Sequence, residues 1–97
     1  HPRISNVYYP YDKDNPDFHI AKKQMKRGSG VISFEYKASK KGVQAFLNRL
    51  SFIKIAVSLG DAETLIEHPA TMTHAVVPEE VRKDMGITNG LIRLSVG

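Results

Sequence analysis

The sequence predicts an α+β fold: a small, mostly antiparallel sheet with helices packed on one face. Residues 31–37 alternate apolar and polar side chains, as a strand does when one side meets the core and the other meets water. Residues 40–50 instead carry apolar side chains at the spacing of one helix face, namely Val43, Phe46, Leu47 and Leu50. Along the chain the expected order of elements is β-α-β-α-β-α-α-β.

Composition bounds the function before any motif is considered. The 97 residues suffice for one domain with a modest core, and 41% hydrophobic with 25% charged residues is ordinary for a globular protein. No apolar run approaches the roughly 18 residues that a membrane helix needs. The chain lacks cysteine, which excludes disulfides and thiolate metal sites. With no secretory leader visible, we expect a cytoplasmic protein, and His1 and Gly97 both suggest truncated ends.

The first half of the chain predicts four elements. Residues 4–9 are rich in β-branched and aromatic side chains and predict a strand. A helix is expected to open at Asn15 and Pro16, a good cap followed by a residue tolerated at the first helical position, and to stop at Gly28. After the strand at 31–37, Ser39 is expected to cap the amphipathic helix.

The second half begins with a predicted strand over residues 53–57, which leads through Ser58 to a turn at Gly60. A short helix is expected next, with Asp61 at its positive end, and Pro69 is expected to end regular structure. An irregular loop should follow before the last helix.

That last helix is expected to start at Pro78, to turn Val81 and Met85 inward and to stop at Gly86. A final strand over residues 91–96 should close the sheet.

Two rival functions can be weighed from the residues. The net charge of +4 could indicate nucleic-acid binding, but the basic residues fall at expected helix ends and no aromatic-rich RNA-binding strand is present. His68 and His74 are six positions apart, which gives no single-face helical spacing for a metal. We therefore expect neither a nucleic-acid partner nor a metal site.

Two stretches carry a specific resemblance. Residues 58–74 read S-L-G-D-A-E-T-L-I-E-H-P-A-T-M-T-H, and residues 90–97 read G-L-I-R-L-S-V-G. They resemble the carboxyl-terminal domain of the pyridoxal-phosphate enzymes of cysteine and methionine metabolism, and the resemblance extends over nearly the whole chain. It implies that residues 1–97 are the small domain of a fold-type I enzyme. The large domain, with the lysine that holds pyridoxal phosphate, would lie upstream, and the complete enzyme would be a homotetramer.

The resemblance also implies which residues bind the amino-acid substrate. Arg93 matches the arginine that binds the substrate's α-carboxylate, for which the planar fork of a guanidinium is better suited than a lysine. Ser58 matches the serine whose main chain and hydroxyl help to hold the same group. Neither a catalytic residue nor a cofactor-binding residue is expected in this chain.

Val57 is the position that we expect to select the substrate. The cystathionine enzymes of this family typically have an acidic residue just before S-L-G, suited to a distant ammonium group, whereas valine suits an apolar side chain. The sequence here is most similar to the methionine gamma-lyases, which implies α,γ-elimination of L-methionine to methanethiol, 2-oxobutanoate and ammonia. Cystathionine gamma-lyase, cystathionine gamma-synthase and homoserine sulfhydrylase remain the alternatives.

Overall fold

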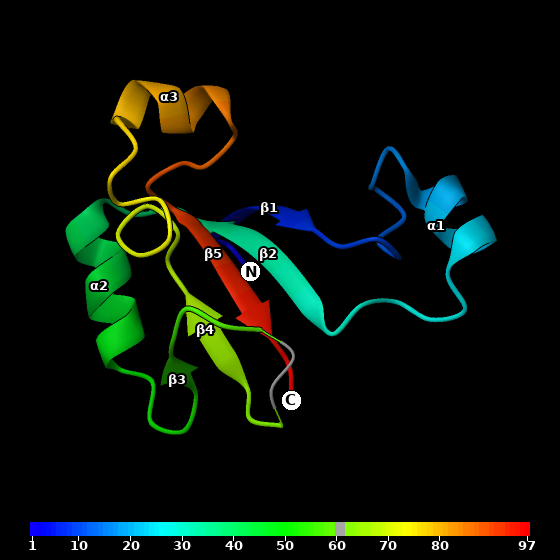
Figure 1. Cartoon of the computed structure of the whole chain (residues 1–97), viewed down its shortest axis with the longest axis horizontal. Helices are drawn as coiled ribbons and strands as arrows, with labels where there is room; N and C mark the ends of the chain where they lie inside the picture. Colours follow the sequence, from blue (N-terminus) through cyan, green and yellow to red (C-terminus); the bar gives the residue numbers. More distant parts are fainter. Residues whose placement is uncertain (60–61) are drawn as a thin grey trace.

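A single five-stranded sheet organises the chain (Figure 1). The computed structural model describes residues 1–59 and 62–97. Its strands are β1 (Ile4–Tyr8), β2 (Val31–Tyr36), β3 (Lys54–Ile55), β4 (Leu65–Glu67) and β5 (Leu91–Ser95). They lie in the order β1-β2-β5-β4-β3, and all neighbours are antiparallel except β3 and β4. The sheet is therefore mostly antiparallel, as predicted.

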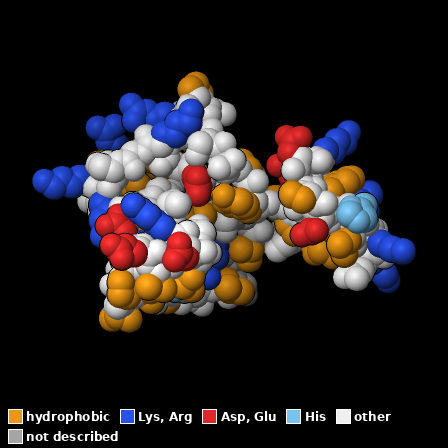
Figure 2. Space-filling model, turned by 90° about the horizontal axis from the view of Figure 1, so that it is seen from above, with side chains coloured by type: hydrophobic (Ala, Val, Ile, Leu, Met, Phe, Trp, Pro, Cys, Tyr) orange, Lys and Arg blue, Asp and Glu red, His pale blue; other side chains and the backbone are white. Residues whose placement is uncertain are grey.

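Three helices accompany the sheet: α1 (Phe18–Gln24), α2 (Lys40–Asn48) and α3 (Glu79–Asp84). Figure 1 shows α2 alongside the sheet, α3 beyond one end of it, and α1 well apart from the sheet. In the space-filling view the α1 region forms a smaller lobe beside the larger one (Figure 2). The predicted α+β class is confirmed. Within the described residues, no helix has both the length and the apolar character to cross a membrane.

The core lies between α2 and the middle of the sheet. Val43 and Leu47 of α2 are buried against Ile66 of β4 and Ile92 of β5. The predicted helix is therefore confirmed together with its inward face. Ser39 caps it as expected, since the Gly42 amide donates to Ser39 Oγ at 3.3 Å.

The prediction of a short helix after the turn at Gly60 is wrong. Residues 65–67 form β4, which is hydrogen-bonded to β5 on one side and to β3 on the other, and all three residues are buried. A strand buried on both faces shows no polar and apolar alternation, so its short apolar sequence does not distinguish it from a helix. Gly60 and Asp61, on which the predicted turn and helix start depended, lie outside the described residues.

The prediction that Val81 and Met85 of α3 point inward is also wrong. Val81 and Met85 are about half exposed, and the buried residue is Arg82, whose exposed fraction is 3%. Its Nε donates to Val77 O and its Nη1 to Asn89 Oδ1, both at 3.2 Å. These hydrogen bonds allow a cation to be buried where the pattern alone favours aliphatic side chains.

The bounds of two other elements differ from prediction. Helix α1 begins at Phe18, because Asn15 Oδ1 accepts from the Asp17 amide at 3.2 Å and forms a turn before the helix. It ends at Gln24, with Met25 already extended, so Gly28 does not end the helix.

The strand predicted over residues 53–57 is reduced to the two residues of β3. Gly86 does follow the last helix as expected, with a positive φ of 81°.

Candidate functional site

Arg93 lies on the face of the sheet opposite α2. Its neighbours in β5, Ile92 and Leu94, face the core that α2 covers, and side chains alternate along a strand. Arg93 is in register with Glu67 of β4 on one side and with Ser33 of β2 on the other. The central strands therefore place an arginine and a glutamate side by side on one face.

The Arg93 guanidinium is held through one of its nitrogens. Its Nη2 lies 2.5 Å from Glu67 Oε2 and donates a hydrogen bond of 3.2 Å to the main-chain oxygen of Ser58. Its Nε and Nη1 make no hydrogen bond to any residue in the described ranges 1–59 and 62–97. The side chain is 24% exposed, so the uncommitted N–H groups can reach an anion that approaches this face.

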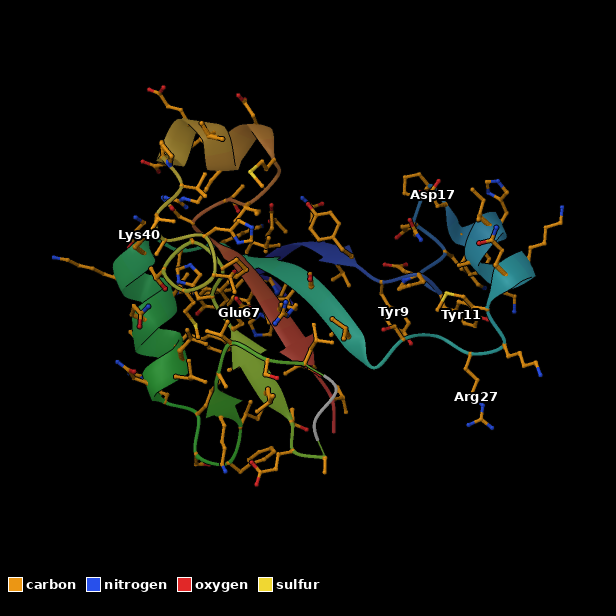
Figure 3. All side chains as sticks on the ribbon, viewed as in Figure 1. Tyr9, Tyr11, Asp17, Arg27, Lys40 and Glu67 are labelled. Atoms are coloured by element: carbon orange, nitrogen blue, oxygen red, sulfur yellow. The ribbon has the colours of Figure 1, made fainter. Side chains whose placement is uncertain are left out.

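Glu67 is almost completely buried, with an exposed fraction of 1%. In Figure 3 it lies among the side chains that surround the sheet, unlike Arg27 and Lys40. Neither of its carboxylate oxygens accepts a well-directed hydrogen bond from a described residue, so Arg93 is held to Glu67 by charge rather than by hydrogen-bond direction. Burying an ionised carboxylate is costly unless a cation accompanies it, so the two side chains depend on each other.

Ser58 and Val57 follow β3 and approach the site along the chain. The structure brings the main chain of Ser58 to Arg93, and the Ser58 side chain is exposed. Val57 is an apolar residue and is 57% exposed.

His68 fixes the strand that carries Glu67. It is fully buried, with Nδ1 2.9 Å from Thr71 Oγ1 and Nε2 2.6 Å from the main-chain oxygen of Asn89. Because a carbonyl only accepts, Nε2 carries the proton and Nδ1 accepts from the Thr71 hydroxyl. Burial lowers the pKa of His68 and the positive charge of Lys40 lowers it further, although the bond to Asn89 opposes them.

A second polar group surrounds Asn89. Its side chain accepts from buried Arg82 and donates to Glu79 Oε1 at 2.7 Å, and this hydrogen bond lowers the pKa of Glu79. The structural role predicted for His68 thus lies in a network that joins the end of β4 to α3 and to the turn before β5. His74 contacts only Thr73 by a side-chain hydrogen bond among the described residues, and no group there has three or more residues able to bind a metal.

A large hollow lies elsewhere. It has a volume of about 850 Å³ and lies between β1 and the α1 lobe, with Ile4, Tyr8 and Ile20 in its lining. None of the residues around Arg93 contributes to it. The charged groups at Arg93 therefore make a better candidate site than the size of this hollow does.

Sequence reasoning missed Glu67. The sequence signal was a carboxylate directly after the apolar residues Leu65 and Ile66. A charge that is buried at such a position needs a partner. Because residues 65–67 were assigned to a helix, Arg93 was not considered as the partner of Glu67. Only the pairing of two strands brings Glu67 to Arg93.

The chain does not offer a site for attaching pyridoxal phosphate. That attachment needs a lysine amine in a protected pocket, whereas every lysine of this chain is exposed. The uncommitted N–H groups of Arg93 instead fit a carboxylate. The residues present therefore fit a carboxylate ligand rather than an attached cofactor.

Comparison with known proteins places this chain in a family. A match to the family described as Cys/Met metabolism PLP-dependent enzyme extends over residues 1–97. The chain is 52% identical over 97 residues to the L-methionine gamma-lyase of Fusobacterium nucleatum subsp. nucleatum and 48% identical to the cystathionine beta-lyase of Coxiella burnetii. It covers 100% of itself and 25% of each relative.

A solved structure gives the same result. The cystathionine gamma-lyase from Lactobacillus plantarum, complexed with L-serine, is matched with a TM-score of 0.90 and 48% identity, over 100% of this chain and 25% of that one. The chain thus spans about a quarter of the length of the proteins it matches. A match along the full chain, in sequence and in fold, means that it belongs to the PLP-dependent enzymes of cysteine and methionine metabolism.

Proposed function

We propose that this chain is the substrate-carboxylate-binding, C-terminal part of a PLP-dependent lyase that degrades L-methionine. The reaction is α,γ-elimination, in which methionine and water give methanethiol, 2-oxobutanoate and ammonia. The apolar Val57 and the 52% identity to an L-methionine gamma-lyase support methionine as the substrate. The lysine that holds the cofactor, and the large domain that contains it, lie in the remainder of the enzyme.

This proposal rests on the Arg93 guanidinium, which has N–H groups that make no hydrogen bond to a described residue. Pyridoxal phosphate supplies an electron sink for bonds at the substrate's α-carbon. Arg93 binds the α-carboxylate through N–H groups that are not committed to described residues, while Nη2 remains on Glu67 and Ser58. The planar guanidinium restricts the orientation of the carboxylate as well as its place, which a lysine cannot do. The chain thereby aligns the bond that is to be broken.

Ser58 has two roles in this proposal. Its main-chain oxygen already accepts from Arg93 and limits the rotation of the guanidinium. Its exposed hydroxyl is available to donate to the same substrate carboxylate. Neither residue transfers a proton, so the acid and base of the reaction belong to the remainder of the enzyme.

A cystathionine lyase or gamma-synthase, or a homoserine sulfhydrylase, is the second candidate. It is favoured by the 48% identity to a cystathionine beta-lyase, which is close to the value for the methionine enzyme. All of these enzymes bind an α-carboxylate, so Arg93 and Ser58 serve equally in each. Val57 is where the two candidates differ.

We further propose that the enzyme is a cytoplasmic homotetramer without a nucleic-acid partner. Figure 2 shows Lys and Arg side chains spread over both lobes of the visible face, with Asp and Glu among them, rather than gathered in one basic groove. Light scattering of the purified complete enzyme measures the assembly directly.

Replacing Arg93 by lysine in the complete enzyme tests the role of the guanidinium. Lysine keeps the charge but loses the paired donors, and a charge-assisted hydrogen bond contributes about 1.5 to 3 kcal/mol. We expect kcat/KM for methionine to fall about tenfold to a hundredfold, with normal cofactor absorbance. Methionine amide, which lacks the anion, should be much less affected. Equal losses on the two substrates would remove Arg93 from the carboxylate site.

A further inference from the structure

Glu67 and Arg93 differ in how firmly each is held. Glu67 lies in β4, which is paired with a strand on both sides, and its side chain is 1% exposed. The next residue, His68, is fully buried and bound to Asn89. Arg93 has a long side chain that is 24% exposed and leads from β5 toward solvent. The carboxylate is therefore the fixed member of the pair and the guanidinium is the adjustable one.

The contacts determine which edge of the guanidinium is occupied. Both the 2.5 Å contact with Glu67 and the 3.2 Å hydrogen bond to Ser58 use Nη2. Because the group is planar, fixing one terminal nitrogen at two points leaves little freedom of rotation for the other two. The N–H groups of Nε and Nη1 make no hydrogen bond to a described residue.

We propose that Glu67 is a positioning residue for Arg93. Its buried carboxylate holds Nη2 against the sheet and so fixes the orientation in which the Arg93 guanidinium meets the substrate's α-carboxylate. The inference rests on the proposed function of Arg93 and adds a second residue to it. Glu67 never touches the substrate; it acts by restricting the orientation of the residue that does.

The burial of this pair has no evident advantage for stability. Neither Glu67 oxygen has a well-directed hydrogen bond from a described residue, and a buried ion pair with unsatisfied groups often stabilises a fold less than apolar residues of equal size. A role in orienting Arg93 explains why a charge occupies the middle of a sheet.

The test is kinetic and uses the complete enzyme with pyridoxal phosphate bound. Glu67→Ala removes the anchor, so kcat/KM for L-methionine should fall about tenfold or more, with less than about a twofold change for methionine amide. Glu67→Gln keeps the size and one acceptor for Nη2, so it should recover part of the loss. Glu63→Gln is the matched control, because Glu63 pairs with Lys54 at 2.7 Å instead of with Arg93, and it should behave as the parent enzyme.

A double-mutant cycle separates this inference from the proposed function. If Glu67 acts through Arg93, Glu67→Ala should cost less than about threefold once Arg93→Lys is present. A full Glu67→Ala loss in that background, or an equal loss on methionine and its amide, would overturn the positioning role while the carboxylate-selective effect of Arg93→Lys keeps the proposed function. An Arg93→Lys variant without that selectivity would instead refute the proposed function.

A crystal structure supplies a readout that does not depend on activity. In substrate-free Glu67→Ala enzyme the Arg93 guanidinium should leave the main-chain oxygen of Ser58 or occupy several orientations, whereas in Glu67→Gln it should stay. An unmoved, singly oriented Arg93 in the alanine variant contradicts the inference. Should the alanine variant fail to fold, the kinetics and structure of the isosteric glutamine variant decide, since full activity on methionine would then exclude a need for the charge.

Discussion

At the scale of single residues, the His68 side chain makes a hydrogen bond at the point where the backbone pairing of β4 with β5 ends. Two positions beyond Glu67 and Arg93, the register would join Pro69 to Leu91, but proline has no N–H to donate. The imidazole Nε2 of His68 donates instead to the main-chain oxygen of Asn89. A side chain thus ties the end of β4 to the segment that enters β5, one residue from Glu67.

The neutral state of His68 makes stability depend on pH. Its pKa is lowered in the folded chain, so the unfolded chain binds a proton at a higher pH than the folded one. Its contribution to stability is complete above the ordinary histidine pKa of about 6.5 and is lost as pH falls from there through the lowered folded value, at up to about 1.4 kcal/mol per pH unit. Relative to His68→Gln, the wild-type enzyme should therefore lose melting temperature between about pH 7 and pH 5.

The measurement is thermal unfolding of both enzymes across that range. His19→Gln is the control, because His19 is an exposed residue of α1 and should not alter the pH dependence of the parent. Parallel curves for wild type and His68→Gln would contradict a buried neutral histidine.

Val57 offers a residue-scale test of the substrate. Its exposed side chain is apolar, so Val57→Glu in the complete enzyme should weaken methionine turnover and improve the relative use of cystathionine. A carboxylate beside the methylthio group loses solvation without gaining a partner, whereas the distal ammonium of cystathionine provides one. Steady-state kinetics on both substrates give the ratio of kcat/KM values. An unchanged ratio would show that Val57 does not select the substrate.

The candidate site could be predicted only in part. A motif made Arg93 and Ser58 candidates, and the structure brings the Ser58 main chain to the Arg93 guanidinium, although their roles toward a substrate stay predictions. The partner of Glu67 could not be found from the sequence, because Arg93 is distant in sequence and meets Glu67 only through the pairing of β4 with β5. Local patterns do not report such contacts.

At the scale of elements, the same contrast separates α2 from β4. The apolar stripe and the Ser39 cap of α2 are local signals, so helix and inward face were both predictable. Strand β4 has only three residues and is buried on both faces, so sheet pairing defines it. The prediction of an inward face for α3 failed for a related reason. Arg82 is buried because it donates hydrogen bonds to Val77 and Asn89, which lie outside the helix.

Helix α2 supplies a test of the core. Leu47 is 1% exposed within the cluster that contains Ile66 and Ile92, so Leu47→Ala should leave a cavity and cost about 2 to 5 kcal/mol of stability. Asn48→Ala, at an exposed position of the same helix, should cost much less. Calorimetry of the complete enzyme should show a lower first transition for the leucine variant alone. Similar transitions for both variants would mean that α2 does not hold this core together.

At the scale of the molecule, the two lobes seen in Figure 2 differ in their support. The larger lobe has the core of α2 and the sheet. The smaller one is held by local contacts around α1, such as the edge-on packing of Tyr11 and Phe18 and the hydrogen bond from the Tyr11 hydroxyl to Met25 O. Sequence periodicity predicted a helix there but not its separation from the sheet, because periodicity shows which side chains share a face and not which surface they meet.

The last prediction follows from what the whole chain contains. It has an arginine that we propose binds the substrate carboxylate, but every lysine is exposed. Residues 1–97 alone should therefore neither bind the cofactor at one specific lysine nor release methanethiol from methionine. Mixing the chain with pyridoxal phosphate should give only weak absorption changes spread over several amines, whereas the complete enzyme treated in the same way should give a saturable band and turnover. Since loss of folding could also abolish activity, circular dichroism should accompany the assay. If residues 1–97 alone, folded or unfolded, bound one equivalent of cofactor and turned over methionine, the proposal that the remainder of the enzyme holds the cofactor would be contradicted.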